Sequence, residues 1–114
     1  MEITEDFLRE TPFAVTVCDN EGIIVYMNDK AAATWEARGG ASLVGKSLYD
    51  CHGERATAMI KNMLATGSTN AYTILKNGQK KLIYQSPWHK GGKVAGLVEL
   101  SIVIPEEMPH FVRG

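Results

Sequence analysis

The sequence has few cysteines, no long apolar run and no signal-peptide start. Two cysteines, Cys18 and Cys51, occur in 114 residues, too few for a secreted scaffold held together by disulfides. No apolar stretch reaches the about 20 residues that span a bilayer, and the first six residues are acidic where a signal peptide is basic. We therefore expect a soluble cytoplasmic protein of one domain, with reduced thiols and no membrane partner.

The sequence also lacks a surplus of charge of either sign. Twelve basic and 13 acidic residues give a net charge of −1, and the basic residues are scattered rather than gathered into a patch that would attract a phosphate backbone. Direct binding to nucleic acid is therefore not expected.

Motifs for catalysis and for structural zinc are missing as well. There is no nucleophile elbow and no metalloprotease helix motif. Cys51 and His52 are adjacent, but no CxxC accompanies them, and His89 and His110 lie in unrelated segments. We predict that the chain is not an enzyme and holds no structural zinc.

One segment matches the phosphate-binding pattern G-x-x-x-x-G-K-S, namely Gly40 to Ser47, which reads GASLVGKS. Phosphate binding by this pattern needs a strand before the loop and a long helix after it. Trp35 to Arg38 instead reads as helix, and Gly53 follows soon after the pattern. We therefore interpret the segment as a turn.

The most informative segment that is present runs from Pro12 to Ala32. Phe13–Cys18 and Ile23–Met27 are apolar and rich in β-branched residues, and the four residues between them are turn formers ending in Gly22, so a β-hairpin is predicted. Asn28 then stands where it can cap a helix over Ala31–Ala37.

The remaining chain predicts one long helix and three more strands. The apolar residues of Glu54–Thr66 recur at helical spacing, and Gly67 ends the helix. Strands are expected over Ala71–Lys76, Lys81–Trp88 and Val94–Ile104, with tight turns at Asn77-Gly78 and Gly91-Gly92. A short helix capped by Thr4 is expected over Glu5–Arg9, and short helical turns are expected within Leu43–Gly53. In the last strand Val98, Leu100, Ile102 and Ile104 alternate with Glu99 and Ser101, as in a sheet covered on one face.

These features resemble the PAS family between Phe7 and Ile104. The resemblance is carried by Asp19 and Gly22 at the hairpin, by Asn28 with Ala31 or Ala32 after it, and by Leu43 to Ser47. It implies an α+β fold: a five-stranded antiparallel sheet with short helices and one longer helix packed on one face. The organisation implied is a flanking helix over 1–11, the PAS-like domain over 12–104 and a tail over 105–114. The chain has Val103-Ile104-Pro105 where many PAS domains end in Asp-Ile-Thr.

The long helix and the sheet suggest a ligand cavity. Methionines on the apolar face of the helix can repack around a small molecule, and the facing strands offer polar groups. The expected ligand-binding residues are Met59, Ile60, Met63, Tyr84, Trp88, Leu100 and Ile102. The first hypothesis is thus a sensory, signal-transducing module that binds a small molecule and signals through dimer or partner contacts.

Two cofactors follow from the resemblance. Haem-binding PAS domains hold iron through a histidine near the long helix, which would be His52 here. Light-sensing PAS domains place a cysteine against flavin, but Tyr49 to Glu54 reads YDCHGE and lacks the arginine and glutamine of that subfamily's pattern. The cofactor remains open, with haem favoured over flavin.

The second hypothesis is a PAS interaction module with a filled core and no ligand. It would use the outer sheet face and the helix that carries Phe7 and Leu8 to hold a partner or a second copy in a homodimer.

Overall fold

A computed structural model describes residues 5–114 as five strands, three α-helices and three short 3₁₀ helices. Thr4, the expected cap of the first helix, lies outside the described residues. The elements are α1 (Asp6–Arg9), β1 (Ala14–Asp19), β2 (Ile24–Met27), α2 (Asp29–Thr34), η1 (Glu36–Arg38), η2 (Gly40–Leu43), η3 (Leu48–Asp50), α3 (Glu54–Thr66), β3 (Asn70–Lys76), β4 (Gln79–Lys90) and β5 (Lys93–Val103).

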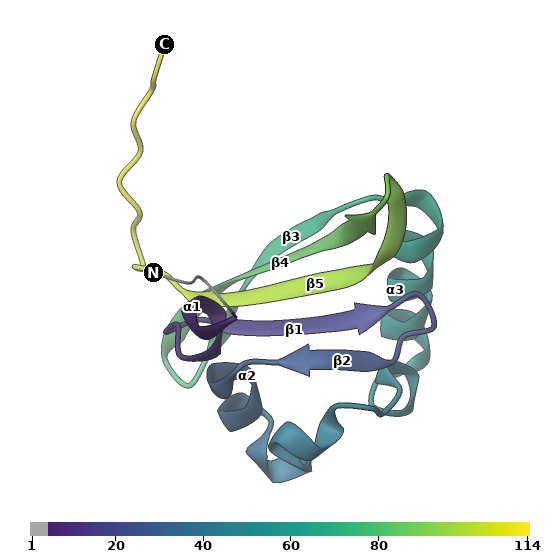
Figure 1. The fold of residues 1–114 in the computed structure, drawn as a ribbon. Helices are drawn as coiled ribbons and strands as arrows, with labels where there is room; N and C mark the ends of the chain where they lie inside the picture. Colours follow the sequence, from purple (N-terminus) through teal and green to yellow (C-terminus); the bar gives the residue numbers. More distant parts are fainter. Residues whose placement is uncertain (1–4) are drawn as a thin grey trace.

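The strands form one antiparallel sheet in the order β2-β1-β5-β4-β3, and α3 lies behind it in the view of Figure 1. The predicted five-stranded antiparallel sheet is thereby confirmed. The first and last strands along the chain, β1 and β5, are neighbours at its centre. No described helix is long and apolar enough to cross a bilayer.

The register divides the side chains between two faces. Residues paired across antiparallel strands project to the same side, and neighbours along a strand alternate. Cys18 and Leu97 are paired and pack against Ile60 and Met63 of α3, so their side is the inner face. The inner face also carries Ala14, Thr16, Ile83, Gln85, Glu99 and Ser101. The outer face carries Val15, Val17, Leu82, Tyr84, Val98, Leu100 and Ile102.

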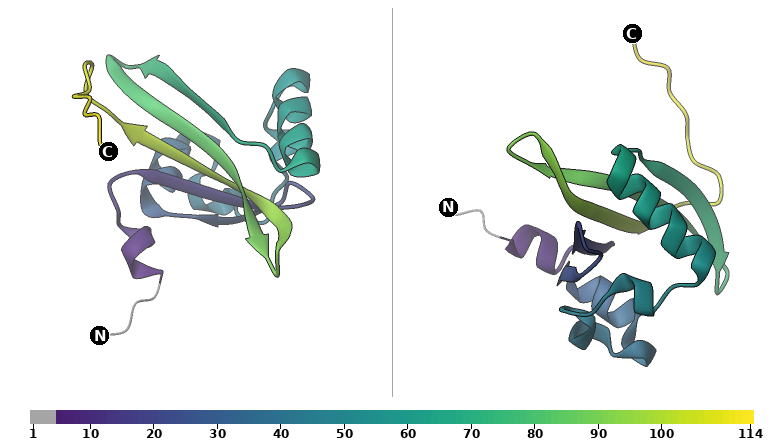
Figure 2. Two further views of the ribbon diagram at one scale, coloured as in Figure 1. Left: turned by 90° about the horizontal axis from the view of Figure 1, so that it is seen from above. Right: turned by 90° about the vertical axis from the view of Figure 1, so that its right-hand side faces the viewer.

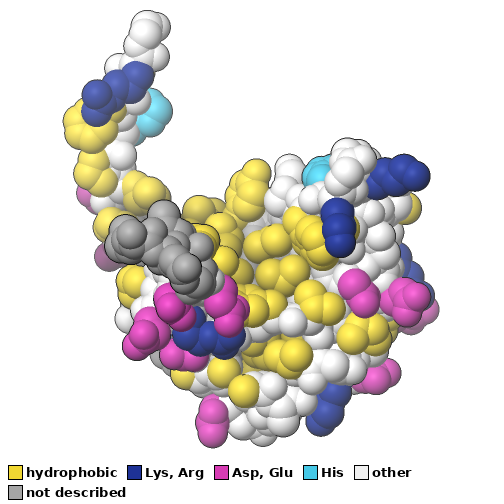
Figure 3. Space-filling view, viewed as in Figure 1, with side chains coloured by type: hydrophobic (Ala, Val, Ile, Leu, Met, Phe, Trp, Pro, Cys, Tyr) yellow, Lys and Arg dark blue, Asp and Glu magenta, His cyan; other side chains and the backbone are white. Residues whose placement is uncertain are grey.

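This division corrects the expected orientation of β5. The apolar set with Leu100 and Ile102 turns away from α3, whereas Glu99 and Ser101 turn toward it. The alternation was read correctly but assigned to the wrong side. The polar residues face a cavity, and the apolar face opposite is the one that Figure 3 presents, with hydrophobic side chains spread over the strands.

Asn28 ties the start of the domain together. Its side chain is fully buried. Oδ1 accepts hydrogen bonds from the backbone N–H groups of Val15 (2.9 Å) and Ala31 (3.0 Å), and Nδ2 donates to the carbonyl oxygens of Leu8 (2.9 Å) and Phe13 (2.8 Å). The predicted helix cap is present, and the same side chain fastens α1 and β1 to the start of α2.

At Gly96, in the central strand β5, the indole of Trp88 and the backbone carbonyl of Cys18 come so close that there is no room for a side chain. The Trp88 indole Nε1 donates a 2.9 Å hydrogen bond to the carbonyl oxygen of Cys18, and it crosses Gly96 to do so. A Cβ at Gly96 would overlap that carbonyl oxygen and lie 2.6 Å from Nε1. Trp88 therefore lies on the outer face, where its hydrogen bond connects β4 to β1 across β5.

The chain after β5 leaves the domain. The amide of Ile104 still bonds to the carbonyl oxygen of Lys80 (2.9 Å), and beyond it residues 105–114 run without regular structure, away from the sheet (Figure 1). Met108, Phe111 and Val112 in this tail are exposed.

Candidate ligand-binding cavity

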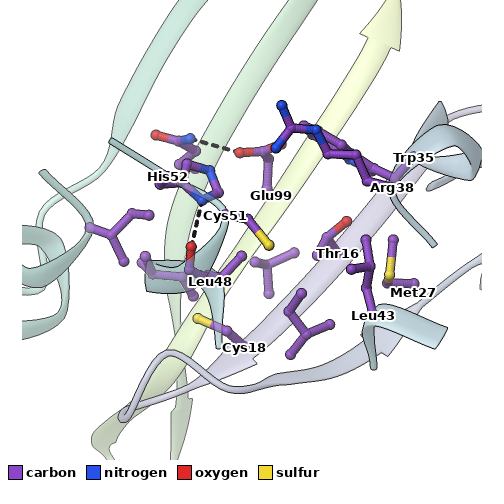
Figure 4. Close-up of a pocket in the computed structure, with 15 residues that line it drawn as sticks. Thr16, Cys18, Met27, Trp35, Arg38, Leu43, Leu48, Cys51, His52 and Glu99 are labelled. Carbon is purple, nitrogen blue, oxygen red and sulfur yellow. Dashed lines mark hydrogen bonds between the residues drawn. The ribbon is translucent and has the colours of Figure 1, made fainter. Parts of the chain in front are cut away.

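A chamber of about 70 Å³ lies between the inner face of the central strands and the segment that joins α2 to α3 (Figure 4). Its apolar part is formed by Cys18, Leu48, Ile60 and Leu97, all in contact with the core. The remaining lining residues are Thr16, Ile24, Met27, Trp35, Arg38, Leu43, Cys51, His52, Gln85, Val98 and Glu99.

A wider groove of about 580 Å³ opens beside the chamber, between α3 and strands β3 and β4. Figure 2 shows α3 standing apart from β3, the edge strand, on this side of the sheet. The two spaces share six lining residues: Thr16, Trp35, His52, Ile60, Gln85 and Glu99. The chamber and the groove therefore form one continuous site.

A short hydrogen-bond relay crosses this site from the edge strand to the centre of the sheet. Asn70 Nδ2 donates to Gln85 Oε1 (3.3 Å), and Gln85 Nε2 donates to Glu99 Oε2 (2.7 Å). All three side chains are half-buried. A carboxylate held at one oxygen keeps further acceptor positions available to a ligand.

His52 projects into both spaces from the loop before α3, and its orientation is fixed. Its Nδ1 lies 2.8 Å from the carbonyl oxygen of Leu48 (Figure 4). Because a carbonyl only accepts, Nδ1 carries the proton in this contact, and in the neutral ring Nε2 is then the acceptor. This tautomer can accept a hydrogen bond from a ligand or coordinate a metal.

Both cysteines also face the chamber, with different environments. Cys18 is buried, and this burial raises the pKa of its thiol above the usual value. Cys51 is half-buried. Neither is in a disulfide, so Cys18 is a protonated thiol that lines the wall as an apolar group.

The structure separates the seven residues expected to bind ligand. Ile60 and Met63 are buried on α3 and line the site, and Met59 lines the groove while 44% exposed. The other four, Tyr84, Trp88, Leu100 and Ile102, lie on the outer face and line neither space. Their expected position in the cavity is wrong, because apolar alternation in β4 and β5 marks the face that α3 does not cover.

Sequence reasoning found only part of the polar side of the site. Gln85 was considered as a polar group that could contact a ligand, and it lines both spaces. Thr16 and Glu99 were not expected there, although Glu99 is the one charged residue inside the apolar run from Val94 to Ile104. A charge in the middle of a central strand signals a buried polar function, and this was the clue that the sequence offered. Cys51 and His52, considered as cofactor ligands, do line the chamber.

His52 by itself does not assign haem to this site. Its tautomer suits an iron ligand, but the enclosed chamber beside it measures about 70 Å³, and the wider groove that it also lines carries the half-buried carboxylate of Glu99 and the amide of Gln85. No group of three or more potential metal-ligating side chains was found within residues 5–114. We derive no function through haem.

The segment that resembles a phosphate loop uses backbone N–H groups for hydrogen bonds within the fold. The amide of Gly45 bonds to Ile24 O (2.7 Å) and that of Lys46 to Leu43 O (2.9 Å), while Leu48 N bonds to Gly22 O (2.8 Å). These N–H groups bond to neighbouring backbone, and the short helix η1, rather than a strand, precedes the pattern.

Comparison with protein families identifies the chain. A family model described as the PAS fold matches residues 8–107. The chain belongs to the PAS family. A search of curated proteins found no match.

Solved structures agree on the fold at low sequence identity. The C-terminal domain of a Streptococcus mutans protein matches with a TM-score of 0.70 at 19% identity, over 85% of this chain and 79% of that chain. The Aer2 receptor of Vibrio cholerae, described as a dual PAS-heme oxygen sensor, matches with a TM-score of 0.61 at 20% identity, over 82% of this chain and 95% of that chain. The Vibrio cholerae VqmA dimer, described among LuxR-type receptors, matches with a TM-score of 0.65 at 14% identity, over 88% of this chain and 51% of that chain.

Proposed function

We propose that this PAS domain is a sensory module that binds a small molecule between the inner sheet face and α3. The observation that carries the proposal is the continuous chamber and groove, which combine an apolar wall with a few polar groups held in fixed orientations. Binding sites for small molecules have this character. PAS domains are generally sensory rather than catalytic, which agrees with this role.

The same space connects ligand occupancy to the packing of α3 and the preceding loop on the sheet. Its walls come from β1 and β5 on one side and from α3 and the loop carrying Trp35, Arg38 and His52 on the other. A ligand that binds better when these walls are closer, or farther apart, shifts the population toward that arrangement. The signal in this proposal is therefore a change in the position of α3 and the loop relative to the sheet.

The outer face supplies the surface for output in this proposal. Tyr84 is 39% and Leu75 78% exposed on it, and Phe7 of α1 is 64% exposed nearby. Helix α1 is held against the sheet by Arg9, whose Nη1 donates to the carbonyl oxygen of Met27 (3.0 Å) and whose guanidinium stacks on the ring of Tyr26. We propose that Phe7, Leu8 and the outer face form a homodimer or partner contact.

Ligand binding is tested by filling the groove. Ala56 lines the groove on α3, whereas Ala58 is exposed on the same helix and lines neither space. Ala56→Trp and Ala58→Trp are therefore matched variants, and both avoid the overpacking that Met63→Trp would cause at a buried position. Fractions of a small-molecule extract that raise the Tm of dialysed wild-type protein and of Ala58→Trp should leave Ala56→Trp unchanged. An equal rise in all three proteins would overturn the assignment.

Self-association is tested at Phe7 rather than by deleting residues 1–10. Deletion would remove the Leu8 carbonyl that Asn28 bonds and the Arg9 contact to Met27, so it would weaken the fold itself. Phe7→Glu changes one exposed side chain, and Phe111→Glu in the tail is the control. Light scattering should show dimer for the wild type and the control and monomer for Phe7→Glu. Unaltered dimer in Phe7→Glu would exclude this contact.

A further inference from the structure

The groove has an apolar wall that remains partly exposed to solvent. Met59 is 44% and Tyr72 42% exposed, and they line it from α3 and β3. Met63 and Ile83 form its buried floor. A partly exposed wall of this kind suits a flexible apolar chain, because methionine side chains adapt to an irregular guest.

Charge is arranged with opposite signs at the two ends of the groove. Glu99 and Gln85 are paired across β5 and β4, and Lys81 follows on the same face of β4, opposite Ile74 of β3. Lys76 lies next along that face of β3. From the Gln85 position to the Lys81 position is four residues, a span of about 13 Å along the strand.

The two lysines at this end have no acidic partner among residues 5–114. The one ion pair found there joins Glu5 and Arg9, far from the groove. The single carboxylate that lines the groove is Glu99, at the opposite end. Lysine stems can lie along apolar surface while their ammonium groups reach a ligand at the rim.

We propose that the groove binds a medium-chain carboxylate, with its head group at Lys81 and Lys76 and its chain along Met59, Met63 and Ile83. The inference deepens the proposed function, on which it rests, by assigning the ligand class of that site. Glu99 repels a carboxylate, so the charges of the groove also set the direction of the ligand. An extended chain of about ten carbons matches the span of about 13 Å between the two ends.

The test compares three ligands that share one chain and differ in the head group. Decanoate, decanol and decylamine are titrated by calorimetry below their micelle concentrations into wild-type protein, Lys76→Gln/Lys81→Gln and Lys90→Gln/Lys93→Gln. The last variant removes two paired lysines from the β4–β5 turn, at the other end of β4. It controls for the loss of two positive charges.

Decanoate is expected to bind wild type and the control tightest, and at least tenfold more weakly to Lys76→Gln/Lys81→Gln, whereas decanol changes less than twofold. Shortening decanoate by two methylenes should weaken binding roughly tenfold, because each buried methylene contributes a similar increment. Tighter binding of decylamine, or equal decanoate binding by all three proteins, overturns the proposal.

Failure of this inference is distinguishable from failure of the proposed function. If wild type binds none of the three compounds but Ala56→Trp still abolishes the Tm rise caused by the extract, the site is a ligand site and the carboxylate class is wrong. If neither experiment shows binding, both are wrong.

Discussion

Gln85 donates a 2.7 Å hydrogen bond from Nε2 to the Glu99 carboxylate, on the sheet face that α3 covers. A charged residue in a central strand is thus held by a neutral amide rather than by a cation, and its remaining acceptor positions face the cavity. In the function proposed above, these acceptor positions are available to a ligand.

Removing the donor of this pair should cost stability. Gln85→Ala leaves the half-buried carboxylate without its amide, and we expect a loss of about 1–2 kcal/mol in the free energy of unfolding. Gln79→Ala, at the exposed start of β4, is the control and should change it by less than about 0.5 kcal/mol. Urea titrations of both variants measure the difference. Equal stability of the two variants would show that the hydrogen bond does not hold Glu99.

Asn28 should be among the most sensitive positions in the chain. Asn28→Ala removes four hydrogen bonds made by a fully buried side chain, and we expect a loss of at least about 3 kcal/mol. Asn20→Ala, which removes one exposed bond to Val94 O, should cost less than about 1 kcal/mol. Thermal unfolding followed by circular dichroism compares them, and a mild effect of Asn28→Ala would contradict the role assigned to this side chain.

The crossing of Trp88 over Gly96 predicts a steric effect separate from that of the hydrogen bond. Gly96→Ala places a methyl group against the Cys18 carbonyl and the indole, so the central strands must separate and the fold should be lost or weakened by more than about 4 kcal/mol. Trp88→Phe removes the hydrogen bond and part of the ring without creating a clash, and should cost about 1–3 kcal/mol. The order of the two variants in denaturant titrations is the readout; the reverse order would refute the close approach.

The two thiols should differ in reactivity. Burial raises the pKa of Cys18, so its thiol stays protonated near neutral pH and should react with a thiol reagent only on unfolding. At pH 7.5 one thiol, Cys51, should react fast, and Cys51→Ala should leave one slow thiol. Two fast thiols in the wild type would place Cys18 in contact with solvent.

Cys18 also makes stability depend on pH in the alkaline range. Its folded pKa is raised, so the unfolded chain loses this proton first, near the usual thiol value of about 8.5. The contribution to stability is complete below about pH 8.5 and declines as the pH rises through the folded value. Cys18→Ala should flatten this part of the curve, and an unchanged slope would assign it to other groups.

The fold was largely predictable because its local signals agree. The predicted helix Glu54–Thr66 coincides with α3, and the predicted strand Ile23–Met27 differs from β2 by one residue. The expected helix Ala31–Ala37 instead divides into α2 and η1 at Trp35. Its periodicity was short, and a 3₁₀ turn at a helix end is set by the loop that follows.

The site was less predictable, because alternation in a strand does not say which face is covered. Leu100 and Ile102 have the pattern of core residues, yet they lie on the outer face, and Glu99 lies toward α3. Apolar alternation along a strand identifies the face covered by the rest of the protein only when a single face of the sheet is covered. Here the inner face borders a cavity whose lining includes polar side chains such as Thr16, Gln85 and Glu99, and the outer face is apolar where α1 and the proposed partner contact lie.

The most direct test of a ligand between the sheet and α3 is a native mass spectrum of untagged protein purified without added cofactor. We predict extra mass on the wild type and on Ala58→Trp that is released on denaturation, and none on Ala56→Trp, with monomer or dimer read from the same spectrum. Bare protein in all three samples, together with no small molecule that raises the Tm, would contradict the sensory role and favour an interaction module with no ligand.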